Sequence, residues 1–214
     1  MDYSAAIAHL QQADPVMARL IARLGPCELG QKIQPAVDVF SSLARSIIYQ
    51  RISIKAANTV YSRFLALYDD RPFPSTQDLL NTPDETLRGA GLSLTKVSYL
   101  KDLAQLVQQG LPDLPTLAAM EDEAIIKALT QVKGIGRWSV QMLLIFQLQR
   151  LDVFPVDDLG LRIAVRDAYG LEEAPGKKLF ETIAQPWQPY RTIACWYLWR
   201  SRDVAQGKLL DSWG

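Results

Sequence analysis

The chain has 214 residues, of which 49% are hydrophobic, and its 23 Lys and Arg residues balance 23 Asp and Glu residues. This length and apolar content support one domain or two lobes with a buried core. A formal net charge of zero argues against a broad, non-specific nucleic-acid binder and leaves room only for a local basic surface. With only two cysteines, no signal peptide and no long apolar span, we expect a soluble intracellular protein.

Apolar residues recur at helical spacing along the chain, and no alternating strand pattern persists. The spacing predicts helices over about 37–48, 60–65, 100–107, 123–131, 138–148 and 159–168. Between the second and third of these, Thr82-Pro83-Asp84-Glu85 is typical of a capping box with proline at the first helical position, and Ser93 is a further N-cap candidate. We therefore predict an all-α fold of two helical lobes that flank an active cleft. Residues 35–148 form one lobe, and residues 1–34 plus 149–214 form the other.

A Gly-x-Gly turn separates the helix predicted over 123–131 from the helix that follows. Gly134 and Gly136 break the first helix, and glycine lets another backbone approach closely. The amides at the start of the second helix have no partner inside it and carry the positive end of its dipole, so the turn is suited to bind a phosphate. On its own, such a turn is more often an ordinary helix connection. No strand is predicted before the glycines, which argues against a dinucleotide-binding site. No Gly-Lys-Ser/Thr sequence follows them, which argues against a P-loop.

A pair of carboxylates, Asp157 and Asp158, stands at the predicted start of the next helix. The helix over 137–149 is about 20 Å long, and the residues over 150–157 span up to about 26 Å when extended. The chain can therefore fold back and bring Asp158 beside Trp138. An aspartate at a helix start accepts amide hydrogen bonds and stays ionised, so each of the two is also a candidate N-cap.

The string from Val132 to Ser139, followed by Asp158, resembles the signature of the helix-hairpin-helix DNA glycosylase superfamily, in its 3-methyladenine DNA glycosylase II (AlkA-like) branch. Three further segments are similar to this branch: its early helix and DNA-inserting loop at 40–57, its Gly-x-Ser-x-x-Lys sequence at 91–100, and its closing helix at 187–200. Too few residues precede the first matched helix for the extra N-terminal domain of many bacterial members, so this chain is similar to a compact form.

The resemblance implies a monofunctional DNA glycosylase that hydrolyses the N-glycosidic bond of alkylated purines, of the 3-methyladenine or 7-methylguanine type, in double-stranded DNA during base excision repair. The base is flipped out of the duplex, and Asp158 stabilises the oxocarbenium-like sugar. An alkylated purine is already cationic or electron-poor, so it leaves without an acid. Stacking on tryptophan would then select the base.

The same resemblance assigns residues to a base pocket. Trp138 and Trp199 are expected there together with Met142, whereas Trp187 and Trp196 are expected to pack in the core.

The resemblance also assigns a DNA-binding surface. Arg51 occupies the position of the family's apolar wedge, so either Gln50 or Arg51 could fill the gap that a flipped base leaves, with Ile52 packed behind. Some of the cations could equally be ordinary solvated charges on helices. The residues expected to contact DNA are Gln50, Arg51, Ser53, Lys96, Lys133, Gly134, Gly136 and Arg137.

Related branches that also cut the DNA strand carry a lysine nucleophile just after the hairpin. This chain has Trp138 there, and an indole cannot form a Schiff base, so we expect no lyase activity. Two cysteines cannot hold a four-cysteine iron–sulfur cluster, and no metal-ligand cluster is evident. We expect no cofactor, apart from a Na⁺ or K⁺ ion that could bind the hairpin carbonyls of Val132 and Gly134, as the resemblance implies.

Two alternative functions stay open. A non-catalytic helix-hairpin-helix module would hold DNA for a partner and would need neither Asp158 nor the tryptophan pair. A glycosylase for deaminated or etheno bases would share the mechanism and differ in the shape of its pocket. We expect the protein to be a monomer.

Overall fold

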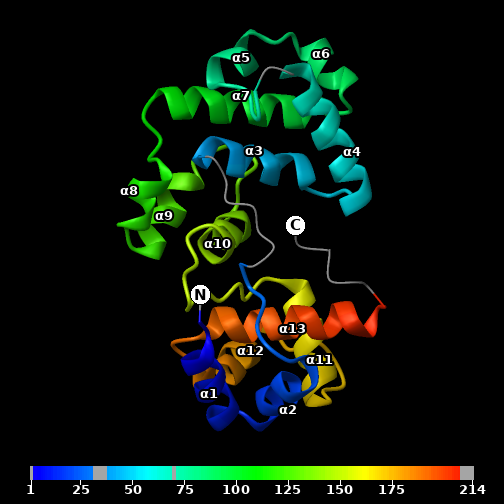
Figure 1. Ribbon diagram of the computed structural model, residues 1–214, viewed down its shortest axis with the longest axis vertical. Coiled ribbons are helices and arrows are strands. Elements are labelled where there is room, and N and C mark those ends of the chain that lie inside the picture. Colours follow the sequence, from blue (N-terminus) through cyan, green and yellow to red (C-terminus); the bar gives the residue numbers. More distant parts are fainter. Residues whose placement is uncertain (1, 31–37, 69–70, 208–214) are drawn as a thin grey trace. The chain divides into compact units, whose positions relative to one another are not determined.

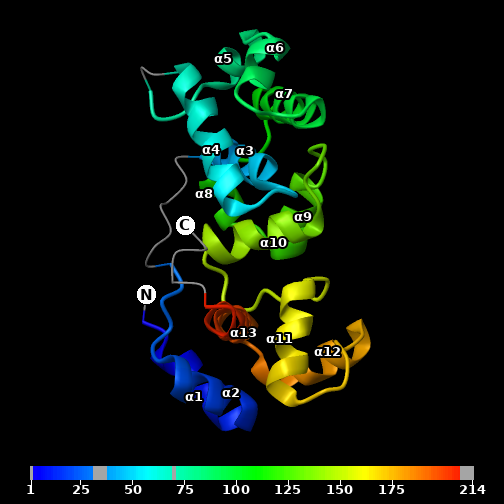
Figure 2. The same cartoon turned by 90° about the vertical axis from the view of Figure 1, so that its right-hand side faces the viewer.

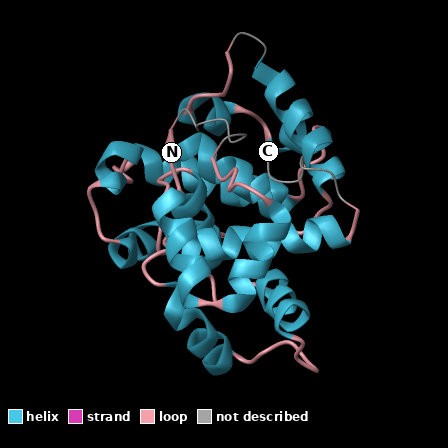
Figure 3. Ribbon diagram, turned by 60° about the horizontal axis from the view of Figure 1, so that its bottom comes forward, coloured by secondary structure: helices cyan, strands magenta, loops and turns pink. Residues whose placement is uncertain are grey.

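The computed structural model describes residues 2–30, 38–68 and 71–207. Within these ranges every regular element is a helix and none is a strand (Figure 3), which confirms the all-α prediction. None of the helices in these ranges is long and apolar enough to cross a membrane.

The chain divides into two compact units. Residues 1–34 and 144–214 form the first unit, and residues 35–143 form the second. This boundary lies inside helix α10 (Arg137–Phe146), whereas the predicted boundary followed residue 148.

The last turn of α10 belongs to the first unit for a physical reason. The carbonyl of Leu144 accepts a hydrogen bond from the amide of Arg150 at 2.9 Å. The ring of Phe146 stacks on the ring of Trp199, with a centroid distance of 6.2 Å. Both partners lie in the first unit, so the end of the helix packs there.

Helix α7 (Leu94–Gln108) organises the second unit (Figures 1 and 2). Its apolar side chains Val97, Leu100 and Leu103 are buried, and it packs between α3 on one side and α5 and α6 on the other. The remaining elements complete this unit around it. They are α3 (Val39–Tyr49), α4 (Ile54–Leu65), the 3₁₀ helix η1 (Ala66–Tyr68), α5 (Thr76–Asn81), α6 (Asp84–Gly89), α8 (Leu114–Ala118), α9 (Asp122–Leu129) and the first part of α10.

Two helix starts in the second unit test the predicted caps. Ser93 is the N-cap of α7, because its hydroxyl accepts a hydrogen bond from the amide of Lys96 at 3.3 Å, as predicted. The predicted capping box before α6 is wrong. Pro83 is the N-cap itself, and the hydroxyl of Thr82 donates to the carbonyl of Asp78 at 2.7 Å. That hydroxyl therefore closes the preceding helix instead of opening the next one.

Helix α13 (Arg191–Ala205) organises the first unit, where it packs against α1 (Ser4–Ala13), α2 (Pro15–Leu24) and α11 (Leu159–Tyr169). The helix α12 (Lys177–Ala184) and the 3₁₀ helix η2 (Gln185–Trp187) complete the unit.

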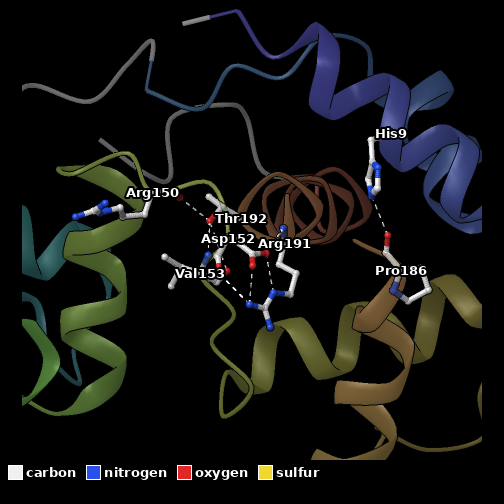
Figure 4. A network of polar contacts seen from close by, with 7 residues as sticks. All are labelled: His9, Arg150, Asp152, Val153, Pro186, Arg191 and Thr192. Atoms are coloured by element: carbon white, nitrogen blue, oxygen red, sulfur yellow. Dashed lines mark hydrogen bonds and ion pairs between the residues drawn. The ribbon is translucent and has the colours of Figure 1, made fainter. Parts of the chain in front are cut away.

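A side-chain contact in the first unit joins α1, near the start of the chain, to η2. The ring of His9 in α1 donates to the carbonyl of Pro186 in η2 at 3.0 Å (Figure 4), and it lies edge-on against the ring of Tyr190. Segments far apart in the sequence are therefore held side by side.

A buried carboxylate holds three segments of the first unit together. Asp14, which is 6% exposed, is the N-cap of α2 and accepts from the amides of Val16 at 2.8 Å and Met17 at 3.3 Å. It also accepts from the indole N–H of Trp187 at 2.8 Å and from the hydroxyl of Tyr169. Burial and the Asp14 carboxylate raise the pKa of Tyr169 far above its ordinary value, so the hydroxyl stays a donor.

Replacing this carboxylate should be costly. In Asp14→Ala the helix loses its N-cap, and Trp187 and Tyr169 each keep a buried donor without an acceptor. We expect a loss of about 3–5 kcal/mol in the free energy of unfolding. The control is Asp113→Ala, which removes the exposed N-cap of α8 and its 2.9 Å bond to Thr116, for a loss of about 1 kcal/mol. Denaturant unfolding measures both, and equal losses would contradict this role of Asp14.

Candidate active site

One face of α13 follows the chain segment that leads to Asp158. Residues 192, 195, 199 and 202 lie at spacings of three and four, so their side chains share this face. At the start of the helix, the hydroxyl of Thr192 donates to the carbonyl of Arg150 at 2.7 Å and accepts from the amide of Val153 at 2.9 Å (Figure 4). The amide of Thr192 donates to the carbonyl of Leu151 at 3.0 Å.

An ion pair beside Thr192 strengthens the same attachment. Arg191 donates through Nε and Nη2 to the two carboxylate oxygens of Asp152, at 2.7 and 2.8 Å (Figure 4). Such a two-point contact fixes orientation as well as distance. The segment that returns from α10 is therefore anchored to the start of α13 before it reaches Asp158.

Asp158 is the N-cap of α11 and is buried, with 9% of its surface exposed. Its oxygen Oδ1 accepts from the amide of Leu161 at 2.8 Å and from the indole N–H of Trp199 at 3.4 Å. Its neighbour Asp157 is exposed and pairs with Lys177 at 2.6 Å. The two predicted carboxylates therefore have different environments, and only Asp158 has the burial that acid–base or electrostatic chemistry uses.

A buried thiol, that of Cys195, lies on the same face of α13 and is influenced by the charge of Asp158. Cys195 lies one turn before Trp199 and is completely buried. Burial raises the pKa of its thiol well above the ordinary value, and the negative charge of Asp158 adds to the effect. The thiol stays protonated, so it is not a nucleophile at neutral pH.

The hairpin between α9 and α10 is closed by a hydrogen bond from the amide of Ile135 to the carbonyl of Val132 at 3.0 Å. Gly134 has φ of +82°, a left-handed conformation that favours glycine. A Cβ atom built there would lie 2.2 Å from Cδ2 of Tyr99, whereas one built on Gly136 would meet nothing within 4 Å. The steric requirement for glycine therefore falls on the first of the two glycines.

Several residues expected to contact DNA also hold the hairpin in place. The side-chain amide of Gln50 donates to the carbonyl of Gly134 at 2.8 Å. Asp102 accepts from the backbone amide of Lys133 at 3.0 Å and pairs with its ammonium group at 2.8 Å. Burial alone would raise the pKa of Asp102, but the bonds from Lys133 outweigh it and hold the pKa below its ordinary value.

Two more predicted cations have protein partners. Arg137 forms an ion pair with Glu123, one bond of which measures 3.0 Å. Lys96 donates to the carbonyl of Ile48, at the end of α3, at 2.6 Å. Burial lowers the pKa of Lys96 from its ordinary value. Each of these contacts braces the hairpin or the loop after α3.

The loop between α3 and α4 presents the residues predicted to enter the duplex. Arg51 is exposed and has φ of +58°, which is uncommon for a residue with a side chain. Ile52 is exposed beside it, and Ser53 is the N-cap of α4, accepting from the amide of Ala56 at 3.3 Å. With the Gln50 amide bonded to Gly134, Arg51 and Ile52 are the side chains that this loop presents outward.

The three residues assigned to a base pocket differ in their surroundings. Trp138, at the start of α10, is 42% exposed, and Met142, one turn later on the same face, is half-buried. Trp199 is only 5% exposed, stacks on Phe146 and donates to Asp158. The two tryptophans expected in the core also differ, because Trp187 is fully buried and Trp196 is half-buried against Tyr197.

The carbonyls considered for a monovalent cation both have hydrogen-bond partners. Val132 accepts from Ile135, and Gly134 accepts from Gln50. A carbonyl oxygen has a second lone pair, so these bonds are compatible with a weakly bound cation but do not build a ligand set for one.

Three residues beside the hairpin or Asp158 were not predicted from the sequence, namely Tyr99, Asp102 and Gly160. Gly160 follows Asp158 by two residues, and a Cβ atom built on it would lie 2.9 Å from Oδ1 of Asp158 and 3.0 Å from Nη1 of Arg202. Tyr99 and Asp102 lie one turn apart on α7, and both contact the hairpin. The only signal for them was their place near the Gly-x-Ser-x-x-Lys segment, which suggested a role for Lys96 alone.

An all-helical fold with a tight glycine hairpin, followed by a buried aspartate at the next helix start, is the arrangement of a helix-hairpin-helix DNA-repair protein. The sequence model described as "HhH-GPD superfamily base excision DNA repair protein" matches residues 44–189. The chain belongs to this superfamily.

Particular relatives agree over most of the chain. The DNA-3-methyladenine glycosylase 1 of Schizosaccharomyces pombe is 35% identical over 92% of this chain and 86% of that protein. The structure of the 3-methyladenine DNA glycosylase of the same yeast, solved in complex with abasic DNA, matches with a TM-score of 0.86 and 33% identity, over 94% and 98% of the two chains. A DNA-3-methyladenine glycosidase from Bacillus halodurans matches with a TM-score of 0.82 and 34% identity, over 97% and 94%.

The hairpin geometry predicts a difference between its two glycines. Gly134→Ala should lower the free energy of unfolding by about 2–4 kcal/mol, because the new methyl group meets Tyr99 in a left-handed backbone. The matched control Gly136→Ala should stay within about 1 kcal/mol of the wild type. In fluorescence anisotropy, Gly134→Ala should also weaken binding to damaged and undamaged duplexes alike. A binding loss confined to damaged DNA, or equal stability of the two variants, would contradict this assignment.

Proposed function

We propose that this chain is a monofunctional DNA glycosylase that hydrolyses the N-glycosidic bond of alkylated purines in double-stranded DNA, as a step of base excision repair. The observation that carries the proposal is Asp158, a buried carboxylate at the start of α11 that accepts from Leu161 and Trp199. Relatives named 3-methyladenine glycosylases, one solved with abasic DNA, support the substrate class and the DNA partner.

Asp158 would act on the sugar. As the bond to the base breaks, positive charge develops on the sugar ring, and a nearby carboxylate stabilises it. The same carboxylate orients the water that attacks C1′. Because an alkylated purine departs from a cationic or electron-poor state, no general acid is required.

The second unit would supply the grip on DNA and a stacking surface. The amides of the hairpin glycines and of the start of α10 would bind a backbone phosphate, while Arg51 or Ile52 would enter the space left by the flipped base. Trp138 is 42% exposed, and a cationic base stacked on an indole gains about 0.5–2 kcal/mol. Flipping costs a few kcal/mol, and less where base pairing is already weakened.

The remaining features of the proposal concern assembly and cofactors. We propose a monomer that acts inside the cell without an iron–sulfur cluster. A Na⁺ or K⁺ ion at the hairpin carbonyls stays a prediction, and no step of the reaction depends on it.

The catalytic assignment predicts unequal effects for neighbouring aspartates. Asp158→Asn keeps an oxygen that can accept from Leu161, but removes the charge, so base release from methylated duplex DNA should fall by about a thousandfold or more. DNA binding and the melting temperature should change little. The control is Asp157→Asn, whose exposed pair with Lys177 contributes at most about 1 kcal/mol. If both variants release bases at the wild-type rate, Asp158 is not the catalytic group.

The product should be an intact strand that carries an abasic site. Trp138 stands where a lysine nucleophile would be needed, and an indole forms no Schiff base. On denaturing gels, the damaged strand should break only after alkali treatment, and borohydride should trap no covalent protein–DNA complex. Strand cleavage at neutral pH, or a trapped complex, would show that the chain has an amine nucleophile and would contradict the monofunctional assignment.

A further inference from the structure

Two donors converge on a single oxygen of Asp158. The amide of Leu161 lies 2.8 Å from Oδ1, and the indole N–H of Trp199 lies 3.4 Å from the same atom. One donor belongs to the helix that Asp158 caps, and the other belongs to α13. Two directional bonds to one oxygen fix the rotation of the carboxylate, and so fix where its second oxygen points.

We propose that Trp199 is a positioning residue for Asp158, acting through its indole N–H and not as a stacking surface for the excised base. This inference depends on the proposed function, because it assigns the group that orients the proposed catalytic carboxylate. It also assigns different roles to the two tryptophans of the expected base pocket. Trp138 keeps the stacking role, and Trp199 sets the direction of the charge that stabilises the sugar.

The surroundings of Trp199 favour an edge-on role over a stacking role. The ring is 5% exposed, and it stacks on Phe146 with an angle of 28° between the ring planes. A platform for a base must leave part of the ring accessible, and Trp138 has 42% of its surface exposed. The edge of Trp199 that carries the N–H is the part directed at Asp158.

Gly160 supports this reading because it leaves the space that the arrangement needs. A Cβ atom at this position would lie 2.9 Å from Oδ1 of Asp158 and 3.9 Å from Cδ1 of Trp199, which adjoins the indole nitrogen. The requirement is for space rather than for an unusual backbone angle, because the φ of Gly160 is not positive. Any side chain at residue 160 would push Oδ1 away from the indole.

The main test is Trp199→Phe, which retains an aromatic ring to stack on Phe146 and removes the N–H. We expect the single-turnover rate of base release from a duplex with 7-methylguanine to fall about tenfold, the effect of one hydrogen bond to a charged group. The affinity for the same duplex should not change. Gly160→Ala should reduce the rate in the same way. The control, Trp196→Phe, changes a half-buried indole on the same helix and should leave the rate unchanged.

A second measurement separates positioning from general support of the fold. A duplex with a pyrrolidine nucleotide presents a cationic mimic of the sugar, and a tetrahydrofuran nucleotide is its neutral counterpart. Trp199→Phe should lower the preference for the cationic duplex about tenfold, while affinity for the neutral duplex and the melting temperature stay at wild-type values.

Three outcomes would overturn the proposal. They are a wild-type rate in Trp199→Phe, an unchanged preference for the cationic duplex, and an equal loss of affinity for both duplexes. Failure of the proposed function is distinguishable, because it would appear as absence of base release by the wild-type protein itself.

Discussion

The constraint on which the first unit depends is that a charged carboxylate must be buried and still be fully oriented. Burying an ion without partners is very costly, so its donors must be part of the fold. Helix α13 meets this requirement with one face. Thr192 holds the returning segment, and Trp199, two turns further along, reaches Asp158. The helix that closes the unit therefore also orients Asp158, the proposed catalytic group, so a change in the packing of α13 would also change the direction of that carboxylate.

The first unit contains two carboxylates of the same design with different outcomes. Asp14 and Asp158 are each a buried N-cap, and each accepts from a tryptophan indole, Trp187 or Trp199. Asp14 also accepts from Met17 and Tyr169, and it thereby holds the start of α2 to α11 and η2. The contrast shows that burial and capping alone do not mark a catalytic aspartate. The proposed catalytic role of Asp158 depends in addition on its place at the start of α11, the first helix after the helix-hairpin-helix motif.

Features set by local sequence were predicted well, and features set by distant partners were not. The helices follow from apolar spacing, and the caps at Ser93 and Asp158 follow from residue type next to a helix start. The Thr82 cap failed because its hydroxyl had a competing acceptor in the preceding helix. The bond from Gln50 to Gly134 joins residues 84 positions apart, and the contact of Tyr99 with the hairpin is also long-range. Neither contact leaves a periodic signal in the sequence. Gln50 and Lys133 were therefore predicted only as DNA contacts, whereas the structure shows that they also hold the hairpin in place.

The most direct test of the account is the identity of what the wild-type protein releases from DNA. Duplex DNA methylated at purines would be incubated with the protein, and the soluble fraction would be separated by chromatography. A monofunctional alkylpurine glycosylase would release free 3-methyladenine or 7-methylguanine while the strands stay uncut at neutral pH. Binding of the same duplex with no release of any free base would contradict the proposed function, and would instead identify the chain as a DNA-holding module whose buried aspartate serves only the fold.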